Sequence, residues 1–288
     1  MAIKEELKKA VPMPLKILKY KAWKLSERVK REWDTINARV NPRPIIVLGN
    51  QKSGTSAIAA LLAEMTDLSV SIDLRKEVDN PTYHKVKRGD LSFAEFVRVN
   101  KLDFSRDIVK EPNLTLFYKE LVEYFPGSQF VFVIRDPRDN IRSILNRLKI
   151  PGNLSSLSPE YRGEITPAWE LIVDGGWLGL KGENYIEMLA ERWNLMADVF
   201  LNHRQQMILS RYDVFVQDKV AAIERLAQSL NLPQVNDIAG KVDIQFQPRG
   251  NKNVNWGYFF GSENLAKIEN ICAQKMSKLD YPVDMDRG

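Results

Sequence analysis

Residues 45–65 predict a strand, a tight loop and a helix in direct succession. The apolar run Ile-Ile-Val-Leu at 45–48 is followed by Gly-Asn-Gln-Lys-Ser-Gly-Thr-Ser at 49–56, and a helical pattern continues to Met65. The loop's glycines let backbone N–H groups turn inward, and the first turn of the helix adds unpaired N–H donors and the positive end of its dipole. The sequence therefore predicts a loop that binds a phosphate-like anion.

The position of the lysine distinguishes this loop from that of nucleoside-triphosphate hydrolases. Their loop follows the pattern G-x-x-x-x-G-K-[ST]. Gly49, Gly54 and Ser56 occupy three of these positions, but Thr55 stands where the lysine belongs, and the lysine is Lys52. An ammonium group there stabilises charge that develops on a bridging oxygen, without a metal ion. The loop thus argues against such a hydrolase and for a site that requires no metal.

The Lys-Ser-Gly-Thr-Ser string resembles the 5′-phosphosulfate-binding loop of sulfotransferases, which use 3′-phosphoadenosine-5′-phosphosulfate (PAPS) as donor. A glycine-containing turn that merely packs tightly is the simpler alternative for so short a motif. The resemblance implies that the donor is bound by Gln51, Lys52, Ser53, Gly54, Thr55 and Ser56.

A second motif combines a buried strand with the start of a helix. Phe-Val-Phe-Val-Ile at 130–134 is typical of a buried parallel strand, and Arg-Asp-Pro-Arg-Asp follows it. The aspartate suits a helix N-cap, and Pro137 suits the first helical turn. Ser143 lies six residues later, about 9 Å along a helix, so Arg135 and Ser143 can reach one ligand at the sheet edge. This spacing resembles the 3′-phosphate-binding motif of sulfotransferases; a capped helix with a solvated arginine is the alternative.

Two further segments match the family in order. Ile-Leu-Ser-Arg-Tyr-Asp at 208–213 resembles the region whose tyrosine contacts the adenine, and Tyr212 is the matching residue. Gln-Pro-Arg-Gly-Asn at 247–251 resembles the C-terminal loop over the 3′-phosphate, which implies binding by Arg249 and Gly250. A core aromatic and a surface charge are the simpler interpretations of the tyrosine and the arginine.

Three side chains are candidates for the general base that takes the proton of the acceptor hydroxyl. Glu77 ranks first because its position resembles that of the catalytic glutamate of glycan sulfotransferases. Glu111 ranks second; it follows a predicted strand, near the place of the catalytic histidine in cytosolic sulfotransferases. His84 ranks third. The ranking is a hypothesis, because such side chains are by default solvated or at helix ends.

The arrangement of candidate elements predicts an α/β fold with three layers, α/β/α, and a mainly parallel central sheet. The connections at 79–106 and 149–182 are rich in Pro, Gly, Asn and Ser and predict lids or binding loops. We expect residues 41–288 to form a single sulfotransferase-like domain. The candidate strands are residues 44–48, 107–110, 129–134 and 206–210.

The first forty residues form a separate, basic part of the chain. Residues 1–40 hold 11 Lys or Arg against 5 Asp or Glu, a difference of 6 against +5 for the whole chain. Apolar residues at three- and four-residue spacing predict an amphipathic helix there. Docking onto its own domain or a partner subunit is the simpler role, and contact with an anionic membrane surface is the alternative. No nucleic-acid reading motif accompanies the charge, so we expect no nucleic-acid partner.

Cysteine content and hydropathy indicate the cellular compartment of the protein. Cys272 is the only cysteine, so no intrachain disulfide can form, and a reducing compartment is the simpler inference. We expect Cys272 to pack in the last helix. Neither a run of 18 apolar residues nor a signal-peptide pattern occurs. We therefore expect a cytoplasmic, bacterial enzyme, with peripheral contact at the inner membrane surface as the option that residues 1–40 leave open.

These features together imply a PAPS-dependent sulfotransferase that acts on an acceptor hydroxyl and releases adenosine 3′,5′-bisphosphate. The context of Glu77 favours a glycan or glycolipid over a small phenol. A P-loop nucleotide kinase and a noncatalytic nucleotide- or glycan-binding module are the alternatives. The acceptor, the general base and the oligomeric state, a homo-oligomer included, stay open. Aromatic residues that either stack on an acceptor ring or belong to the core are Tyr161, Trp169, Trp177 and Tyr185.

Overall fold

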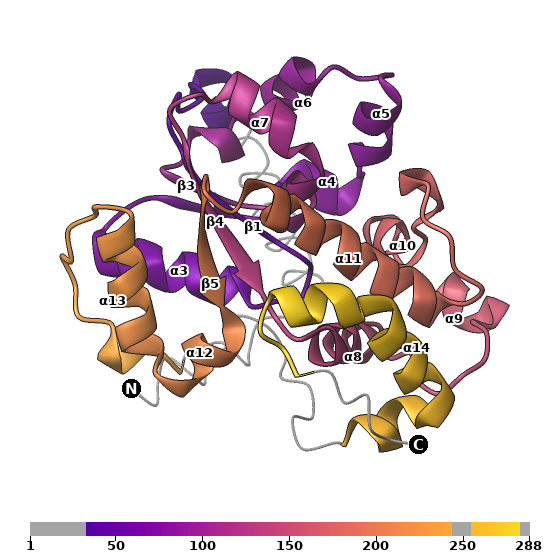
Figure 1. The fold of residues 1–288 in the computed structure, drawn as a ribbon. Helices are drawn as coiled ribbons and strands as arrows, with labels where there is room; N and C mark the ends of the chain where they lie inside the picture. Colours follow the sequence, from indigo (N-terminus) through magenta and orange to yellow (C-terminus); the bar gives the residue numbers. More distant parts are fainter. Residues whose placement is uncertain (1–32, 244–254, 283–288) are drawn as a thin grey trace, which may run out of the picture.

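A computed structural model describes residues 33–243 and 255–282 of the chain. Five parallel strands form one central sheet in the order β2-β3-β1-β4-β5 (Figure 1). The strands are β1 (Ile45–Gly49), β2 (Val70–Ile72), β3 (Ile108–Lys110), β4 (Gln129–Ile134) and β5 (Met207–Arg211). The α-helices are α3 (Thr55–Thr66), α4 (Arg75–Asp79), α5 (Tyr83–Arg88), α6 (Phe93–Val99), α7 (Tyr118–Tyr124), α8 (Pro137–Leu148), α9 (Pro159–Gly163), α10 (Pro167–Val173), α11 (Tyr185–His203), α12 (Tyr212–Gln217), α13 (Lys219–Ser229) and α14 (Trp256–Lys278). The 3₁₀ turns are η1 (Asp103–Ser105), η2 (Pro112–Phe117), η3 (Gly176–Leu178) and η4 (Ala239–Lys241).

Helices cover both faces of the sheet, because the strands are apolar on both sides. Ile45 and Val47 of β1 belong to a core cluster with α3 and α13, whereas Ile46 and Leu48 belong to the larger cluster on the opposite face. Successive residues of a strand point to opposite faces, so one short apolar strand contributes to both clusters. The larger cluster contains residues of α7, α8, α11 and α14, and Figure 1 shows the three layers. The predicted α/β/α arrangement is confirmed.

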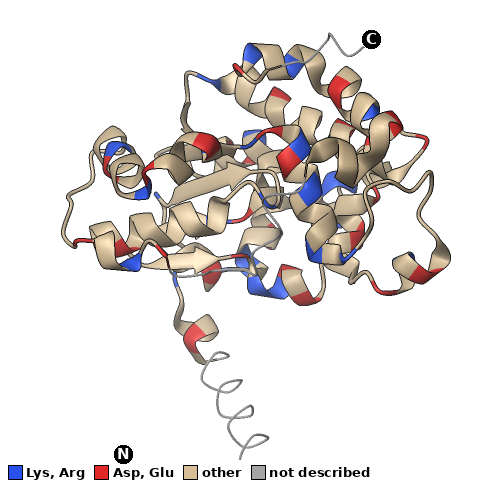
Figure 2. Ribbon diagram, turned by 90° about the horizontal axis from the view of Figure 1, so that it is seen from below, with Lys and Arg blue, Asp and Glu red and all other residues tan. Residues whose placement is uncertain are grey.

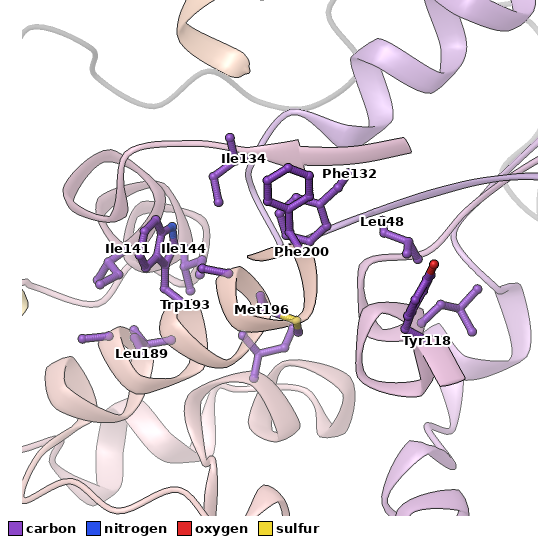
Figure 3. Close-up of a cluster of buried hydrophobic side chains, with 14 of the residues drawn as sticks. Leu48, Tyr118, Phe132, Ile134, Ile141, Ile144, Leu189, Trp193, Met196 and Phe200 are labelled. Carbon is purple, nitrogen blue, oxygen red and sulfur yellow. The ribbon is translucent and has the colours of Figure 1, made fainter. Parts of the chain in front are cut away.

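The larger core cluster holds α8 against the sheet. Figure 3 shows Trp193 of α11 against Ile141 and Ile144 of α8, and Met196 of α11 and Phe132 of β4 belong to the same cluster. All five are at most 1 % exposed. This packing fixes the start of α8 directly after β4, at the carboxyl edge of the sheet.

The strand order creates a crevice at that edge. The chain leaves β1 toward β2 on one side and leaves β4 toward β5 on the other, and β1 and β4 are neighbours. Loops that diverge from adjacent parallel strands open a crevice at the carboxyl ends, where open α/β sheets bind ligands. The loops after β1 and β4 are the two that carry the phosphate-binding motifs predicted from the sequence.

The four predicted strands are confirmed to within one residue at each end. The sequence-based prediction missed β2. That strand has only three residues, Val-Ser-Ile, and its central serine is 8 % exposed. Three residues are too few to display either an alternating pattern or a buried apolar run.

The prediction of loops at 79–106 and 149–182 is wrong over the helices α5, α6, α9 and α10. Aromatic residues of the first stretch, Phe96 among them, are buried in the core. In the second stretch Pro159 and Pro167 occupy the first positions of α9 and α10. Proline at that position starts a helix, because its missing N–H has no helical partner to lose.

The described N-terminal residues include a helical segment at 33–37, which projects from the body of the protein (Figure 2). Residues 1–32 lie outside the described part, so the predicted amphipathic helix and its docking or membrane contact stay predictions. Elsewhere Lys and Arg lie interspersed with Asp and Glu (Figure 2). Cys272 is fully buried in α14, as predicted. Within residues 33–243 and 255–282, every helix is too short or too polar to cross a bilayer.

Candidate active site

A cavity of about 980 Å³ opens at the carboxyl edge of the sheet. Every strand contributes to its lining at or just beyond its carboxyl end. The contributing residues, from β1 to β5, are Lys52, Asp73, Lys110, Arg135 and Tyr212. The volume is in the range of small-molecule binding sites, and cationic side chains from three of the strands converge in it.

The loop after β1 has the geometry of an anion cradle. Gly54 is the N-cap of α3, with φ 99°, and no side chain caps this helix. Gly54, Thr55 and Ser56 line the cavity, so the first-turn N–H groups lie at its wall. A Cβ atom on Gly54 would lie 2.3 Å from Cδ2 of Tyr212. Only glycine therefore permits both the left-handed backbone and the close approach of the tyrosine ring.

Gly49 connects β1 to this loop in a conformation that other residues do not adopt. Its φ is 140°, and a Cβ atom would lie 2.4 Å from the carbonyl oxygen of Val133. We expect Gly49→Ala to lower the free energy of unfolding by about 3 kcal/mol or more, because backbone strain and a steric clash add. Chemical denaturation measures this change. Gly240→Ala is the control, since nothing lies within 4 Å of its Cβ position, and equal losses in both variants would contradict the prediction.

Asn140 of α8 holds the loop in place. Its Nδ2 donates to the carbonyl oxygen of Gln51 at 2.7 Å and to Oγ of Ser53 at 3.0 Å, and its Oδ1 accepts from Nδ2 of Asn50. Asn140 is fully buried. Asn140 was not among the site residues predicted from the sequence. The available signal was an asparagine inside an amphipathic helix, where this residue is unfavourable unless it has a specific partner.

Lys52 lies at the wall of the cavity in a left-handed backbone conformation, with φ 66°. Burial, together with the charges of Arg147, Arg135 and Lys110, lowers the pKa of its ammonium group to about 8, while the charge of Asp73 opposes this shift. The group is therefore still mainly protonated at neutral pH. Positive charges that lower one another's pKa create a strong local attraction for an anion.

Arg135 joins the two motifs predicted to bind phosphate. Its Nη1 donates to the carbonyl oxygen of Lys52 at 3.2 Å, and its guanidinium carbon lies 4.4 Å from the ring centroid of Tyr212. Ser143 lies on α8 and also lines the cavity. Asp136 is the N-cap of this helix, as predicted, and accepts from the N–H of Arg138. The structure thus brings Lys52, Arg135, Ser143 and Tyr212 to one cavity.

The three candidate bases differ in their surroundings. The Glu77 carboxylate lines the cavity but accepts hydrogen bonds from the N–H and hydroxyl of Thr82 and from Nδ2 of Asn100. These bonds tie it to the start of α5. His84 belongs to α5, and the residues that line the cavity do not include it. Burial lowers the pKa of its imidazole, with the charges of Arg88 and Lys85 acting in the same direction.

Glu111 lies just beyond β3 and lines the cavity, although only 4 % of the residue is exposed. Its carboxylate accepts from the N–H groups of Asn113 and Leu74. Burial, together with the negative charge of Asp73, raises the pKa of Glu111 to about 7. A carboxyl group whose pKa lies near neutrality and that faces a cavity is characteristic of acid–base catalysis.

Asp73 and Lys110 form an ion pair beside this carboxyl group. Asp73 follows β2 with φ 63°, and 35 % of its side chain is exposed, while Lys110 is almost fully buried. Asp73 was not among the site residues predicted from the sequence, because β2, the strand that positions it, was not predicted. Its place directly after Val-Ser-Ile was the available signal.

A comparison with known protein families shows which family the chain belongs to. The family model described as "Sulfotransferase domain" matches residues 42–255. The chain belongs to this family. The matched range begins just before β1 and includes every strand of the sheet and the loops that line the cavity. A search of the curated proteins found no match.

The fold of one solved sulfotransferase agrees with this assignment. The sulfotransferase resembles the crystal structure of a sulfotransferase from Mycobacterium avium, with 13 % identity and a TM-score of 0.52 over 90 % of this chain and 82 % of that chain. A sulfotransferase from Alicyclobacillus acidocaldarius matches at 17 % identity and a TM-score of 0.49, over 84 % of this chain and 98 % of that chain. At these identities the likeness concerns the fold alone.

Other predicted residues of the sulfotransferase lie in different places. Arg249 and Gly250 fall in 244–254, outside the described residues, so their role stays a prediction. Of the aromatic residues considered for acceptor binding, only Trp169 lines the cavity. Tyr185 is 3 % exposed and donates its hydroxyl hydrogen to the carbonyl oxygen of Pro151. The remaining two, Tyr161 and Trp177, pack against the larger core cluster.

Proposed function

We propose that this sulfotransferase uses PAPS as donor and transfers its sulfuryl group to an acceptor hydroxyl. The observation that carries the proposal is the uncapped start of α3 beside Lys52, an ammonium group whose pKa is lowered to about 8 among other cations. Such a site attracts a multiply charged anion. When bound, PAPS supplies a sulfuryl group activated by its bond to a phosphate.

The residues of the cavity fit the two charged ends of this donor. Lys52 and the N–H groups of the loop at 51–56 would hold the phosphosulfate end, and Arg135 with Ser143 would hold the 3′-phosphate. Tyr212 would contact the adenine. The ammonium of Lys52 then stabilises the negative charge that builds on the bridging oxygen as the bond between sulfur and that oxygen breaks. Sulfuryl transfer by these groups requires no metal ion.

Glu111 is our preferred general base. As the new bond between sulfur and the acceptor oxygen forms, the hydroxyl proton passes to its carboxylate, and adenosine 3′,5′-bisphosphate leaves. The pKa near 7 supports this choice, because proton transfer is most efficient when the pKa of the base lies near the working pH. Glu77 is the second candidate, and its carboxylate accepts hydrogen bonds from Thr82 and Asn100. His84 is the third alternative.

A glycan or glycolipid hydroxyl is the acceptor we propose. The wall of the cavity includes the apolar side chains of Leu148, Trp169 and Ile172 and charged residues of α4 and α8. It therefore combines an aromatic ring with polar groups. Sugars bind to such walls, since one face of the ring is apolar and its edge carries hydroxyl groups. We propose a cytoplasmic location, without a nucleic-acid partner.

Thermal melting followed by a transfer assay tests the proposed function. We expect adenosine 3′,5′-bisphosphate to raise the melting temperature, because a ligand that binds only the folded state stabilises it, and ATP with magnesium to have little effect. Labelled PAPS should then transfer its label to a saccharide or glycolipid in a panel that also contains phenols. Stabilisation by ATP with magnesium alone would favour a nucleotide kinase, and binding of PAPS without turnover on any acceptor would favour a noncatalytic module.

The pH dependence of kcat/KM for the donor should be bell-shaped. Glu111 must lose its proton, so the value rises as the pH passes about 7, and Lys52 must keep its proton, so the value falls as the pH rises through about 8. Asp73 raises both pKa values, so Asp73→Asn should move both limbs to lower pH. Asp198→Asn, an exposed change on α11, is the control. Unmoved limbs in Asp73→Asn would contradict the assignment.

A further inference from the structure

A buried arginine lies behind the donor loop. Arg192 of α11 is fully buried, and its Nη2 donates to Oε1 of Gln51 at 3.1 Å and to Oδ1 of Asn113 at 2.8 Å. Nε2 of Gln51 also donates to Oδ1 of Asn113, at 2.8 Å. The three side chains form a closed network, of which Gln51 and Asn113 line the cavity and Arg192 lies behind them.

The positive charge of Arg192 has no ionic partner in the described part of the chain. Within residues 33–243 and 255–282, no carboxylate lies within 4.0 Å of its guanidinium, and its Nε and Nη1 make no hydrogen bond. Arg138, which is also fully buried, is paired with Asp136 and Glu269. Burial lowers the pKa of Arg192 to about 10, whereas the charge of Glu111 raises it.

A buried, unpaired charge is unfavourable in the absence of a ligand. Apolar residues of similar size would pack into the same space at lower cost, so packing alone does not account for an arginine here. A bound anion makes the buried charge of Arg192 less unfavourable, because the negative charge of the anion attracts the guanidinium across the amide side chains of Gln51 and Asn113. Charge that is buried and only partly satisfied is characteristic of functional sites.

We propose that Arg192 is a positioning residue for the donor. It fixes the amides of Gln51 and Asn113 at the wall of the cavity, and its charge adds to the attraction for the phosphosulfate end. The network also joins the loop after β1 to the turn after β3, which carries Glu111, so one side chain aligns the donor loop with the proposed base. This inference rests on the proposed function.

Substitutions that separate charge from packing test the proposal. Arg192→Met and Arg192→Gln remove the charge, Arg192→Lys keeps it, and Arg204→Met removes an exposed charge just after α11 as the control. Calorimetry measures binding of adenosine 3′,5′-bisphosphate, and melting without ligand reports stability. We expect the two neutral variants to bind about tenfold more weakly or worse, Arg192→Lys to stay within about threefold of the wild type, and the control to be unchanged.

A merely structural role predicts a different result. All three Arg192 variants would then melt at lower temperature and yet bind the bisphosphate as tightly as the wild type, which would overturn the proposal. Steady-state kinetics adds a second criterion: the KM for the donor should rise in Arg192→Gln while the KM for the acceptor stays constant, and the reverse would also overturn it. If one of the two neutral variants does not fold, the comparison of the other one with Arg192→Lys still tests the proposal. Failure of the wild type to bind the bisphosphate would refute the proposed function itself.

Discussion

Lys52→Met is expected to lower kcat for sulfuryl transfer by about 10²–10³-fold, the usual effect of removing one group that stabilises charge in the transition state. The fold should not suffer. Burial and neighbouring cations lower the pKa of this ammonium, which means that the folded state disfavours its charge, and methionine removes that charge. Single-turnover transfer from labelled PAPS measures the rate, and melting measures stability.

Lys87→Met is the matched control for this substitution, because Lys87 is an exposed lysine on α5, away from the cavity. We expect it to transfer at the wild-type rate. A Lys52→Met enzyme with near-normal kcat would show that the ammonium does not stabilise the leaving group. A large loss of melting temperature in the same variant would indicate that Lys52 supports the loop instead.

Glu111→Gln is expected to lower kcat by about 10²–10⁴-fold, the range that a positioned general base contributes. Glutamine keeps an oxygen that can accept from the N–H of Asn113, so the turn after β3 should persist. Rapid-quench measurement of a single turnover, at a pH above 7, separates the chemical step from product release. The acid limb of the pH profile should disappear in the residual activity.

Glu77→Gln provides the comparison that decides between the two carboxylates. We expect it to affect stability more than turnover, because Glu77 accepts from Thr82 at the start of α5 and from Asn100 after α6. Loss of turnover in Glu77→Gln with normal turnover in Glu111→Gln would restore the ranking that the sequence alone suggests. In that case the raised pKa of Glu111 would be a consequence of burial without a catalytic role.

Helices and strands that are long and have a uniform pattern were predictable from the sequence, whereas short or mixed ones were not. β1 contains the apolar run 45–48 and ends in a glycine, and β4 contains the apolar run 130–134 and is followed by Arg-Asp-Pro. The positions of these two strands and of the loops after them were therefore predictable. β2 was not, because three residues with a central serine carry almost no pattern. α9 and α10 were missed because a proline at the first helical position resembles, in sequence, a proline that ends a helix.

Local motifs identified the donor side of the site better than the acceptor side. Lys52 and Arg135 belong to contiguous strand-loop-helix units, which local sequence specifies. Asn140 and Arg192 act on the donor loop from α8 and α11, and their roles depend on contacts across 89 and 141 positions of the chain. The position of Asp73 depends on β2, the strand that was not predicted from the sequence. Tertiary packing brings Asn140 and Arg192 to the donor loop and Asp73 to the cavity. The sequence offers an asparagine within a helix and an aspartate after Val-Ser-Ile, and neither of these signals identifies the contact that the residue makes in the fold.

A crystal structure with adenosine 3′,5′-bisphosphate tests the central claim most directly. The account predicts the 5′-phosphate at the N-terminus of α3, within hydrogen-bonding distance of the Lys52 ammonium, and the 3′-phosphate at Arg135 and Ser143. A bisphosphate bound elsewhere, or bound in this cavity with the Lys52 side chain directed away from the 5′-phosphate, would contradict it.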